Sequence, residues 1–70
     1  MKRNNEFLKQ VGKKIRNVRK LRGISYVQLA PKIPMKPESL RKVELGHVSC
    51  LLVNLKGIAD ALDVDIKLFL

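Results

Sequence analysis

The fold is decided by GKKIRNVRKLRGIS, residues 12–25, and SLRKVELG, residues 39–46, because each stretch places a charge beside apolar residues. Apolar residues recur at helical spacing in the first stretch, and Arg19 falls about 20° from Leu8 on a wheel of about 100° per residue. Glu44 likewise falls within about 40° of the apolar side of its helix. A buried charge is costly unless it is paired, and a bidentate pair offsets that cost best. The sequence therefore predicts an ion pair between Arg19 and Glu44.

Residues that start and stop helices predict the remaining elements. Gly23 and Gly46 suit the left-handed position that ends a helix. Ser25 and Gln28 have the spacing of a capping box, and Pro37 suits the first turn of a helix. Five helices and no strand are predicted, over residues 7–21, from 26 to about 30, over 37–45, over 51–62, and in a short turn that Asp65 caps and that runs through Phe69.

This arrangement resembles the helix-turn-helix of the phage-repressor and Cro type, also called XRE-like. In that family a first-helix arginine pairs with a glutamate at the end of the recognition helix. The resemblance runs from about Gly12 to Leu68 and includes YVQLA in the second helix and NLKGIADALDV in the fourth. It implies a compact, all-α, five-helix, lambda-repressor-like DNA-binding domain over residues 1–70. The helix-turn-helix would lie at helices 2 and 3, and residues 1–6 would form a flexible N-terminal arm.

Positive charge is concentrated in the first two thirds of this 70-residue chain, whose net charge is +9. Residues 1–45 contain 13 Lys or Arg and three Glu, whereas residues 46–70 contain two Lys and three Asp. On the first helix, a basic row has steps of four, three and four residues and consists of Lys9, Lys13, Arg16 and Lys20. Like charges at this spacing repel, and a row of phosphates would turn that cost into a gain. A solvated surface and an amphipathic helix lying on a membrane are the alternatives.

The family resemblance implies a set of DNA contacts: Tyr26, Lys36, Pro37, Glu38, Ser39, Arg41, Lys42 and His47, with Lys13 and Arg16 from the first helix. Among the base-reading positions, Glu38 can accept from a cytosine amino group and Lys42 can donate to guanine. Two alternatives remain open. Glu38 can simply stabilise the positive end of its helix, and Tyr26, which replaces a usual glutamine, can pack its ring between helix ends.

Two prolines, Pro31 and Pro34, distinguish this chain from the family pattern, in addition to Tyr26. Pro31 predicts that the second helix ends early, near Ala30, because proline is unfavourable inside a helix. Pro34 replaces the usual turn glycine, and its ring fixes φ near −65°, so we expect the turn to be rebuilt. The segment PKIPMKP also has the spacing of a polyproline ligand for SH3-like grooves, although Ile33 and Met35 match core positions of the helix-turn-helix.

Several function classes find no support in the sequence. Cys50 is the single cysteine, and no Cys/His cluster has metal-site spacing, so no disulfide, metal or cofactor is predicted. No nucleophile, acid–base pair or phosphate-binding glycine loop predicts an enzyme, and no small-molecule ligand is evident. The polar start MKRNNEF is unlike a signal peptide, and no stretch is apolar enough to span a bilayer. The expected location is a reducing cytoplasm without membrane contact.

The predicted function is transcriptional regulation by a sequence-specific, dimeric protein that binds double-stranded DNA. The homodimer is expected to use the apolar residues Leu51, Leu52, Leu68, Phe69 and Leu70, which exceed the needs of one small core. Alternatively, Leu68 or Phe69 closes the core of the monomer. A protein-interaction module on a degenerate helix-turn-helix scaffold is the rival function.

Overall fold

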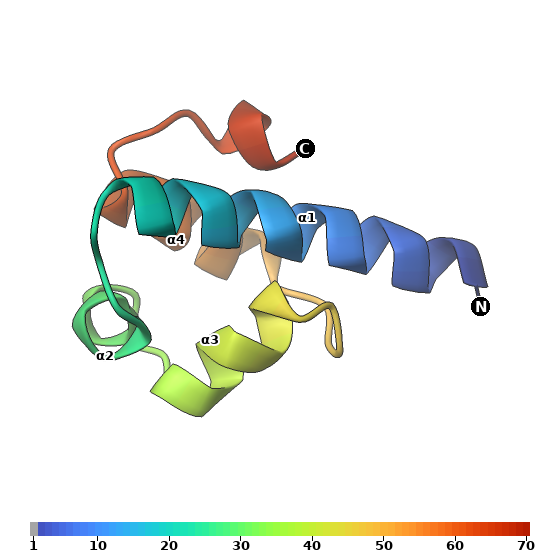
Figure 1. Ribbon diagram of the computed structural model, residues 1–70, viewed down its shortest axis with the longest axis horizontal. Helices are drawn as coiled ribbons and strands as arrows, with labels where there is room; N and C mark the ends of the chain where they lie inside the picture. Colours follow the sequence, from blue (N-terminus) through green and yellow to red (C-terminus); the bar gives the residue numbers. More distant parts are fainter. Residues whose placement is uncertain (1) are drawn as a thin grey trace.

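The longest helix, α1, lies across the other elements in the computed structural model, which describes residues 2–70 (Figure 1). In chain order the elements are α1 (Lys2–Leu21), α2 (Tyr26–Leu29), the 3-10 helix η1 (Ala30–Lys32), α3 (Pro37–Glu44), α4 (Leu52–Ala61) and the 3-10 helix η2 (Ile66–Phe69). Figure 1 shows α2 and α3 on one side of α1, η2 on the other, and α4 behind. The described part of the chain contains no strand, so the all-α prediction is confirmed.

The predicted count of five helices is wrong, because residues 2–70 contain four α-helices and two 3-10 helices. The last expected helix is η2, a single turn closed by hydrogen bonds such as Leu68 N to Asp65 O at 2.9 Å. As predicted, Asp65 caps it, since its side chain accepts from Lys67 N at 2.9 Å.

The expected flexible arm is helical in the structure, because α1 already begins at Lys2. Met1 lies outside the described residues. The sequence contains no glycine or proline between Lys2 and Val11, so no residue there stops the helix. Figure 1 shows the N-terminal part of α1 extending past the other elements.

Two glycines end helices where the sequence predicts. Gly23 has φ of 67° after α1, and Gly46 has φ of 75° after α3. In both places the next amide reaches back across the last turn, as in the bond from Ile24 N to Arg19 O at 3.2 Å. The capping box is also present, since Ser25 Oγ accepts from Gln28 N at 3.2 Å and Gln28 Oε1 accepts from Ser25 N at 2.9 Å.

The turn between η1 and α3 differs from the predicted one. Helix α2 does end early, and Pro31 stands in the first turn of η1, where proline is tolerated. However, Pro34 has a positive φ of 22°, a conformation that glycine usually adopts. The turn therefore keeps the backbone conformation expected for the usual glycine, and the predicted rebuilding of the turn is not observed. The bond from Met35 N to Ala30 O at 3.0 Å closes the turn. Pro34 is therefore strained, and the packing of its neighbours must hold it there.

The core lies between all four α-helices, and η1 and η2 also contribute buried side chains. Its largest fully buried side chains are Ile15, Leu29, Leu40, Ile58, Leu62 and Phe69. Phe69 is 0% exposed, so its predicted role in a dimer surface is wrong and the alternative, closure of the monomer core, is correct. Ile33 is also buried, and Pro31 and Lys32 lie in the 3-10 helix η1, so PKIPMKP is not an exposed polyproline ligand. No helix within residues 2–70 combines the length and apolarity needed to cross a bilayer.

Candidate nucleic-acid interface

The predicted ion pair between Arg19 and Glu44 is present and buried. Arg19 Nε donates to Glu44 Oε2 at 2.8 Å, and Nη2 donates to Oε1 at 3.1 Å. Arg19 Nη1 also donates to the Ile24 carbonyl at 2.8 Å, so the guanidinium spans the end of α1 and the end of α3. The hydrogen bond with Glu44 raises the pKa of Arg19. The pair fixes the position of α3 against α1 by a bidentate, charge-assisted contact.

Tyr26, the first residue of α2, lies against this pair. The guanidinium carbon of Arg19 is 4.1 Å from the centre of the Tyr26 ring, within the range of a cation–π contact. The ring is half-buried, as the packing interpretation predicts. A half-buried ring still exposes part of its surface, so a phosphate contact by Tyr26 stays a prediction.

Two glycines, Gly12 and Gly46, allow α1 and the end of α3 to approach closely. The sequence predicts a role for Gly46 as a helix end but none for Gly12. A Cβ on Gly12 would meet backbone oxygens of α3, including that of Val43 at 2.5 Å. A Cβ on Gly46 would lie 2.7 Å from Lys9 Cγ. Gly12 was missed, although a glycine inside an otherwise apolar helical pattern is a signal of close packing.

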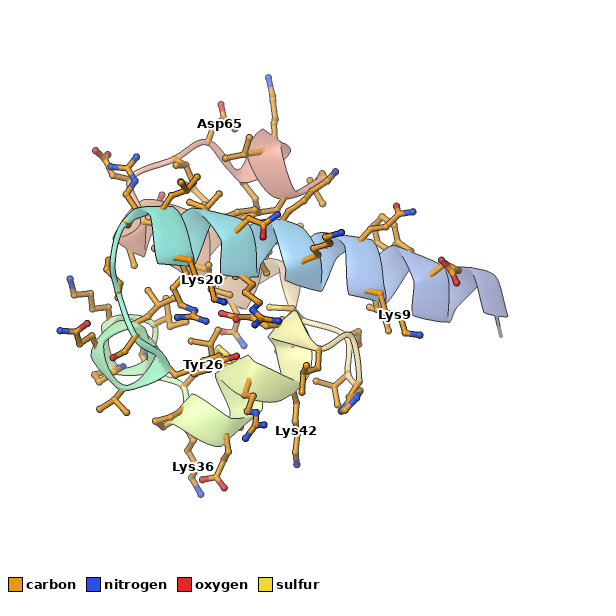
Figure 2. The ribbon with its side chains drawn as sticks, in the orientation of Figure 1. Lys9, Lys20, Tyr26, Lys36, Lys42 and Asp65 are labelled. Atoms are coloured by element: carbon orange, nitrogen blue, oxygen red, sulfur yellow. The ribbon has the colours of Figure 1, made fainter. Side chains whose placement is uncertain are left out.

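Helix α3 presents its polar residues to solvent. Leu40, Val43 and Glu44 are buried, which turns the opposite side outward. The predicted contacts exposed there are Lys36, Pro37, Glu38, Arg41 and Lys42, while Ser39 is half-buried. Figure 2 shows Lys36 and Lys42 pointing away from the body of the domain. An exposed helix of eight residues with this chemistry fits the major groove of DNA.

The basic row of α1 is exposed along its whole length, from Lys9 to Lys20. Figure 2 places Lys9 and Lys20 on the side of α1 that faces α3, and Asp65 on the opposite side of the molecule. Lys13 and Arg16 lie between them in the same row and are also exposed. The row and the outer side of α3 together form a positively charged surface, which is the electrostatic footprint of a polyanion site.

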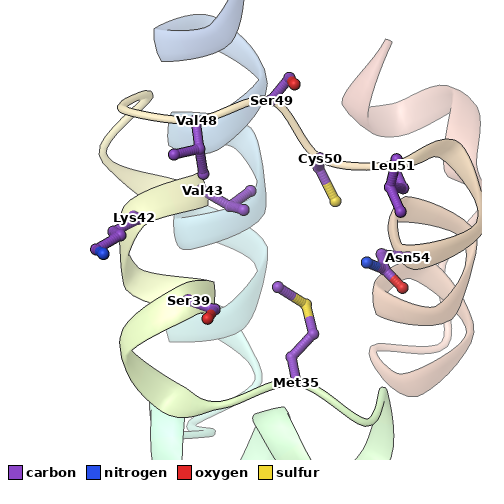
Figure 3. Close-up of a pocket in the computed structure, with 9 residues that line it drawn as sticks. All are labelled: Met35, Ser39, Lys42, Val43, Val48, Ser49, Cys50, Leu51 and Asn54. Atoms are coloured by element: carbon purple, nitrogen blue, oxygen red, sulfur yellow. The ribbon is translucent and has the colours of Figure 1, made fainter.

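A hollow of about 310 Å³ lies between α3 and the start of α4, and no pattern in the sequence predicts it. Met35 points into it from below, and Cys50 and Asn54 face it from the α4 side (Figure 3). Lys42 stands at its edge and points away from it. His47, at the start of the loop that follows α3, is exposed, and its contact with DNA stays a prediction. Burial raises the pKa of the Cys50 thiol, so it stays protonated.

The apolar residues predicted for a dimer are exposed apart from Phe69. Leu51 and Leu52 are each 68% exposed at the start of α4, and Leu68 and Leu70 are 51% and 58% exposed near the C-terminal end. These side chains lie on segments other than α2 and α3.

Titratable side chains do not gather into a metal site. Within residues 2–70, no group of three or more His, Cys, Asp or Glu could hold an ion. The buried side-chain nitrogen and oxygen atoms of the described residues all have hydrogen-bond partners.

Comparison with known proteins agrees with this geometry. A family model described as helix-turn-helix matches residues 15–69. The crystal structure of the restriction-modification controller protein C.AhdI from Aeromonas hydrophila is similar, with a TM-score of 0.87 and 28% sequence identity. The match covers 90% of this chain and 96% of that one. No curated protein sequence matches the chain.

Proposed function

Because this chain belongs to the helix-turn-helix family of DNA-binding transcriptional regulators, we propose that it binds particular duplex sequences as a homodimer and acts as a small repressor or controller protein. The likeness to a restriction-modification controller protein supports the controller role. In this proposal the chain is one domain that acts in the cytoplasm without catalysis or a cofactor.

The observation that carries the proposal is the buried pair of Arg19 and Glu44. It holds α3 at a fixed angle to α1, with the exposed residues of α3 beside the basic row. A recognition helix needs this rigidity, because hydrogen bonds to base edges require positions that hold to within a fraction of an ångström. The basic row then supplies the contacts that orient the protein on the phosphates without reading sequence.

Two residues of α3 are proposed to read bases. Glu38 and Lys42 are both exposed and lie one helical turn apart. Glu38 would accept a hydrogen bond from a cytosine amino group, and Lys42 would donate to O6 or N7 of guanine. Pro37 and Arg41 flank them, and Arg41 can reach a base or a phosphate. The exposed ring edge of Tyr26, with Lys36 and His47, would contact the backbone.

The surface of α3 that is proposed to contact bases is short, and a homodimer would double it. One α3 can cover only a few base pairs, whereas two copies related by a two-fold axis read half-sites about 34 Å apart. Leu51, Leu52, Leu68 and Leu70 remain the proposed contacts, since they are exposed on a different part of the chain from α3. The expected operator is therefore an inverted repeat.

The test is binding to random duplex DNA at several salt concentrations, followed by selection and sequencing of the bound fraction. We expect affinity to fall steeply with salt, because Lys and Arg release counterions from phosphates. We also expect the selected pool to converge on an inverted repeat. Absence of salt-sensitive binding at low ionic strength would overturn the proposal in favour of a protein-interaction module.

A further inference from the structure

Glu38 is the one exposed acidic residue of α3. The other acidic residue of this helix, Glu44, is buried in the pair with Arg19. The exposed charged residues near Glu38 on the outer side of α3, such as Arg41 and Lys42, are basic. A carboxylate on a surface that faces phosphates is repelled by them, so a specific contact is needed to offset that repulsion.

The carboxylate of Glu38 is not used inside the protein. Neither ion pair within residues 2–70, and none of the side-chain hydrogen bonds there, involves Glu38. Glu38 lies in the first turn of α3, whose N-cap residue Lys36 makes no side-chain cap. A favourable interaction with the positive end of the helix requires no hydrogen bond to the carboxylate. Its oxygens therefore stay available for a donor from outside the protein.

The chemistry of the major groove selects the base that suits this carboxylate. A carboxylate only accepts hydrogen bonds, and the base donors in the major groove are the amino groups of cytosine and adenine. Adenine presents the acceptor N7 beside its amino group, which repels a carboxylate. Cytosine has a C–H group in the corresponding position. Glu38 is therefore best suited to the N4 amino group of cytosine.

We propose that Glu38 makes DNA binding sensitive to methylation of the amino group of this cytosine. The inference rests on the proposed function and adds to it the modification state of the bound DNA. In a C·G pair, one amino hydrogen of cytosine bonds to guanine O6 and the other points into the major groove. A methyl group on N4 has to take the second position if the pair is to stay intact. Glu38 would then face a methyl group in place of its donor.

Loss of the donor is more costly for a carboxylate than for a neutral acceptor. The carboxylate loses water when α3 enters the groove, and a charged group left unpaired there costs more than a neutral one. The protein would therefore bind DNA whose cytosine amino group is unmethylated and be excluded where that group is methylated. A methyl group at C5 of the same base leaves the amino donor in place, which gives a matched comparison.

The base to modify is found by repeating the selection of bound sequences with Glu38→Ala. The cytosine whose preference this variant loses is the one assigned to Glu38. Lys42 lies four residues further along α3, about 6 Å along the helix axis. The guanine assigned to Lys42 should therefore lie within about two base-pair steps of this cytosine. Glu6→Ala is the matched control, because Glu6 is exposed on α1 and its loss removes the same negative charge.

The experiment measures affinity by fluorescence anisotropy for three versions of the selected duplex. They carry cytosine, N4-methylcytosine or 5-methylcytosine at the assigned position. For the wild type and Glu6→Ala, we expect N4-methylation to raise the dissociation constant at least about tenfold, and 5-methylation to change it less than about threefold. For Glu38→Ala, N4-methylation should change it less than about threefold. Circular dichroism would check that both variants are folded.

Several outcomes would overturn the inference. They are equal affinity of the wild type for unmodified and N4-methylated duplexes, equal sensitivity of the wild type and Glu38→Ala, equal weakening by the two modifications, and a selection in which Glu38→Ala loses no cytosine preference. Salt-sensitive, sequence-selective binding in those cases would leave the proposed function standing. Absence of salt-sensitive binding to any duplex would overturn the proposed function itself.

Discussion

The guanidinium carbon of Arg19 lies 4.1 Å from the centre of the Tyr26 ring while two of its nitrogens donate to Glu44. One side chain of α1 therefore contacts both helices of the helix-turn-helix. It meets α2 at its first residue and α3 at its last. A change at Arg19 should consequently affect stability and the relative placement of α2 and α3 together.

Arg19→Met should be strongly destabilising. Removing one partner of a buried ion pair leaves the other charge unpaired, which typically costs about 3–5 kcal/mol. A core of this size supplies only about 3–5 kcal/mol in total, so we expect much of the variant to be unfolded at 25 °C. Urea titration followed by circular dichroism measures the effect.

The matched control for Arg19→Met is the double variant Arg19→Met, Glu44→Met. Replacing both partners removes the orphaned charge, so the double variant should be more stable than Arg19→Met alone. A loss below about 0.5 kcal/mol for Arg19→Met would contradict burial of the pair, since a solvent-exposed pair contributes that little.

Gly12→Ala should also be destabilising, by about 2–3 kcal/mol, because the new methyl group would press against the backbone of α3. Gly57→Ala is the matched control. Its Cβ would meet only side-chain atoms of Ile33, the nearest being Cγ2 at 3.0 Å. Alanine favours a helix over glycine by about 0.5–1 kcal/mol. Thermal unfolding of the two variants compares them. Similar stabilities would show that α1 and α3 can separate at little cost.

Local chemistry made much of this fold predictable from sequence. The capping box of Ser25 and Gln28 and the helix ends at Gly23 and Gly46 involve residues at most a few positions apart, and the structure confirms them. The Arg19–Glu44 pair was predictable over a long separation because periodicity placed both charges on buried faces. In such cases the sequence itself contains the physical constraint.

Tertiary packing decided the features that the sequence left open or indicated wrongly. Phe69 and Leu70 are adjacent apolar residues, and only the path of η2 turns the first into the core and the second outward. The residues around Gly12 in the sequence do not show why this position holds a glycine. The reason becomes visible only in the structure, where the backbone of α3 lies against it. The φ of Pro34 likewise follows from the elements on both sides rather than from the preference of the residue.

Pro34→Gly should stabilise the protein or leave its stability unchanged. A proline at positive φ is strained, because its ring favours φ near −65°, and glycine would relieve that strain. Against this, glycine makes the unfolded chain more flexible, at a cost of about 0.4–1 kcal/mol. Pro31→Ala, at the relaxed start of η1, should lose stability without any relief of strain. Chemical denaturation measures the free energy of unfolding of both variants. A loss above about 1 kcal/mol for Pro34→Gly would contradict strain at Pro34.

Lys42→Ala and Lys13→Ala should weaken DNA binding in different ways. Lys13 belongs to the exposed basic row, so its loss should weaken binding to all sequences and reduce the slope of log affinity against log salt by up to about one unit. Lys42 is exposed on α3, and its loss should relax preference at particular base pairs, by about 1–3 kcal/mol of discrimination. Fluorescence anisotropy with the selected operator and with random duplex separates the two effects. If Lys42→Ala weakens binding to both duplexes equally, Lys42 contacts phosphate and the reading of bases must be assigned to other residues of α3.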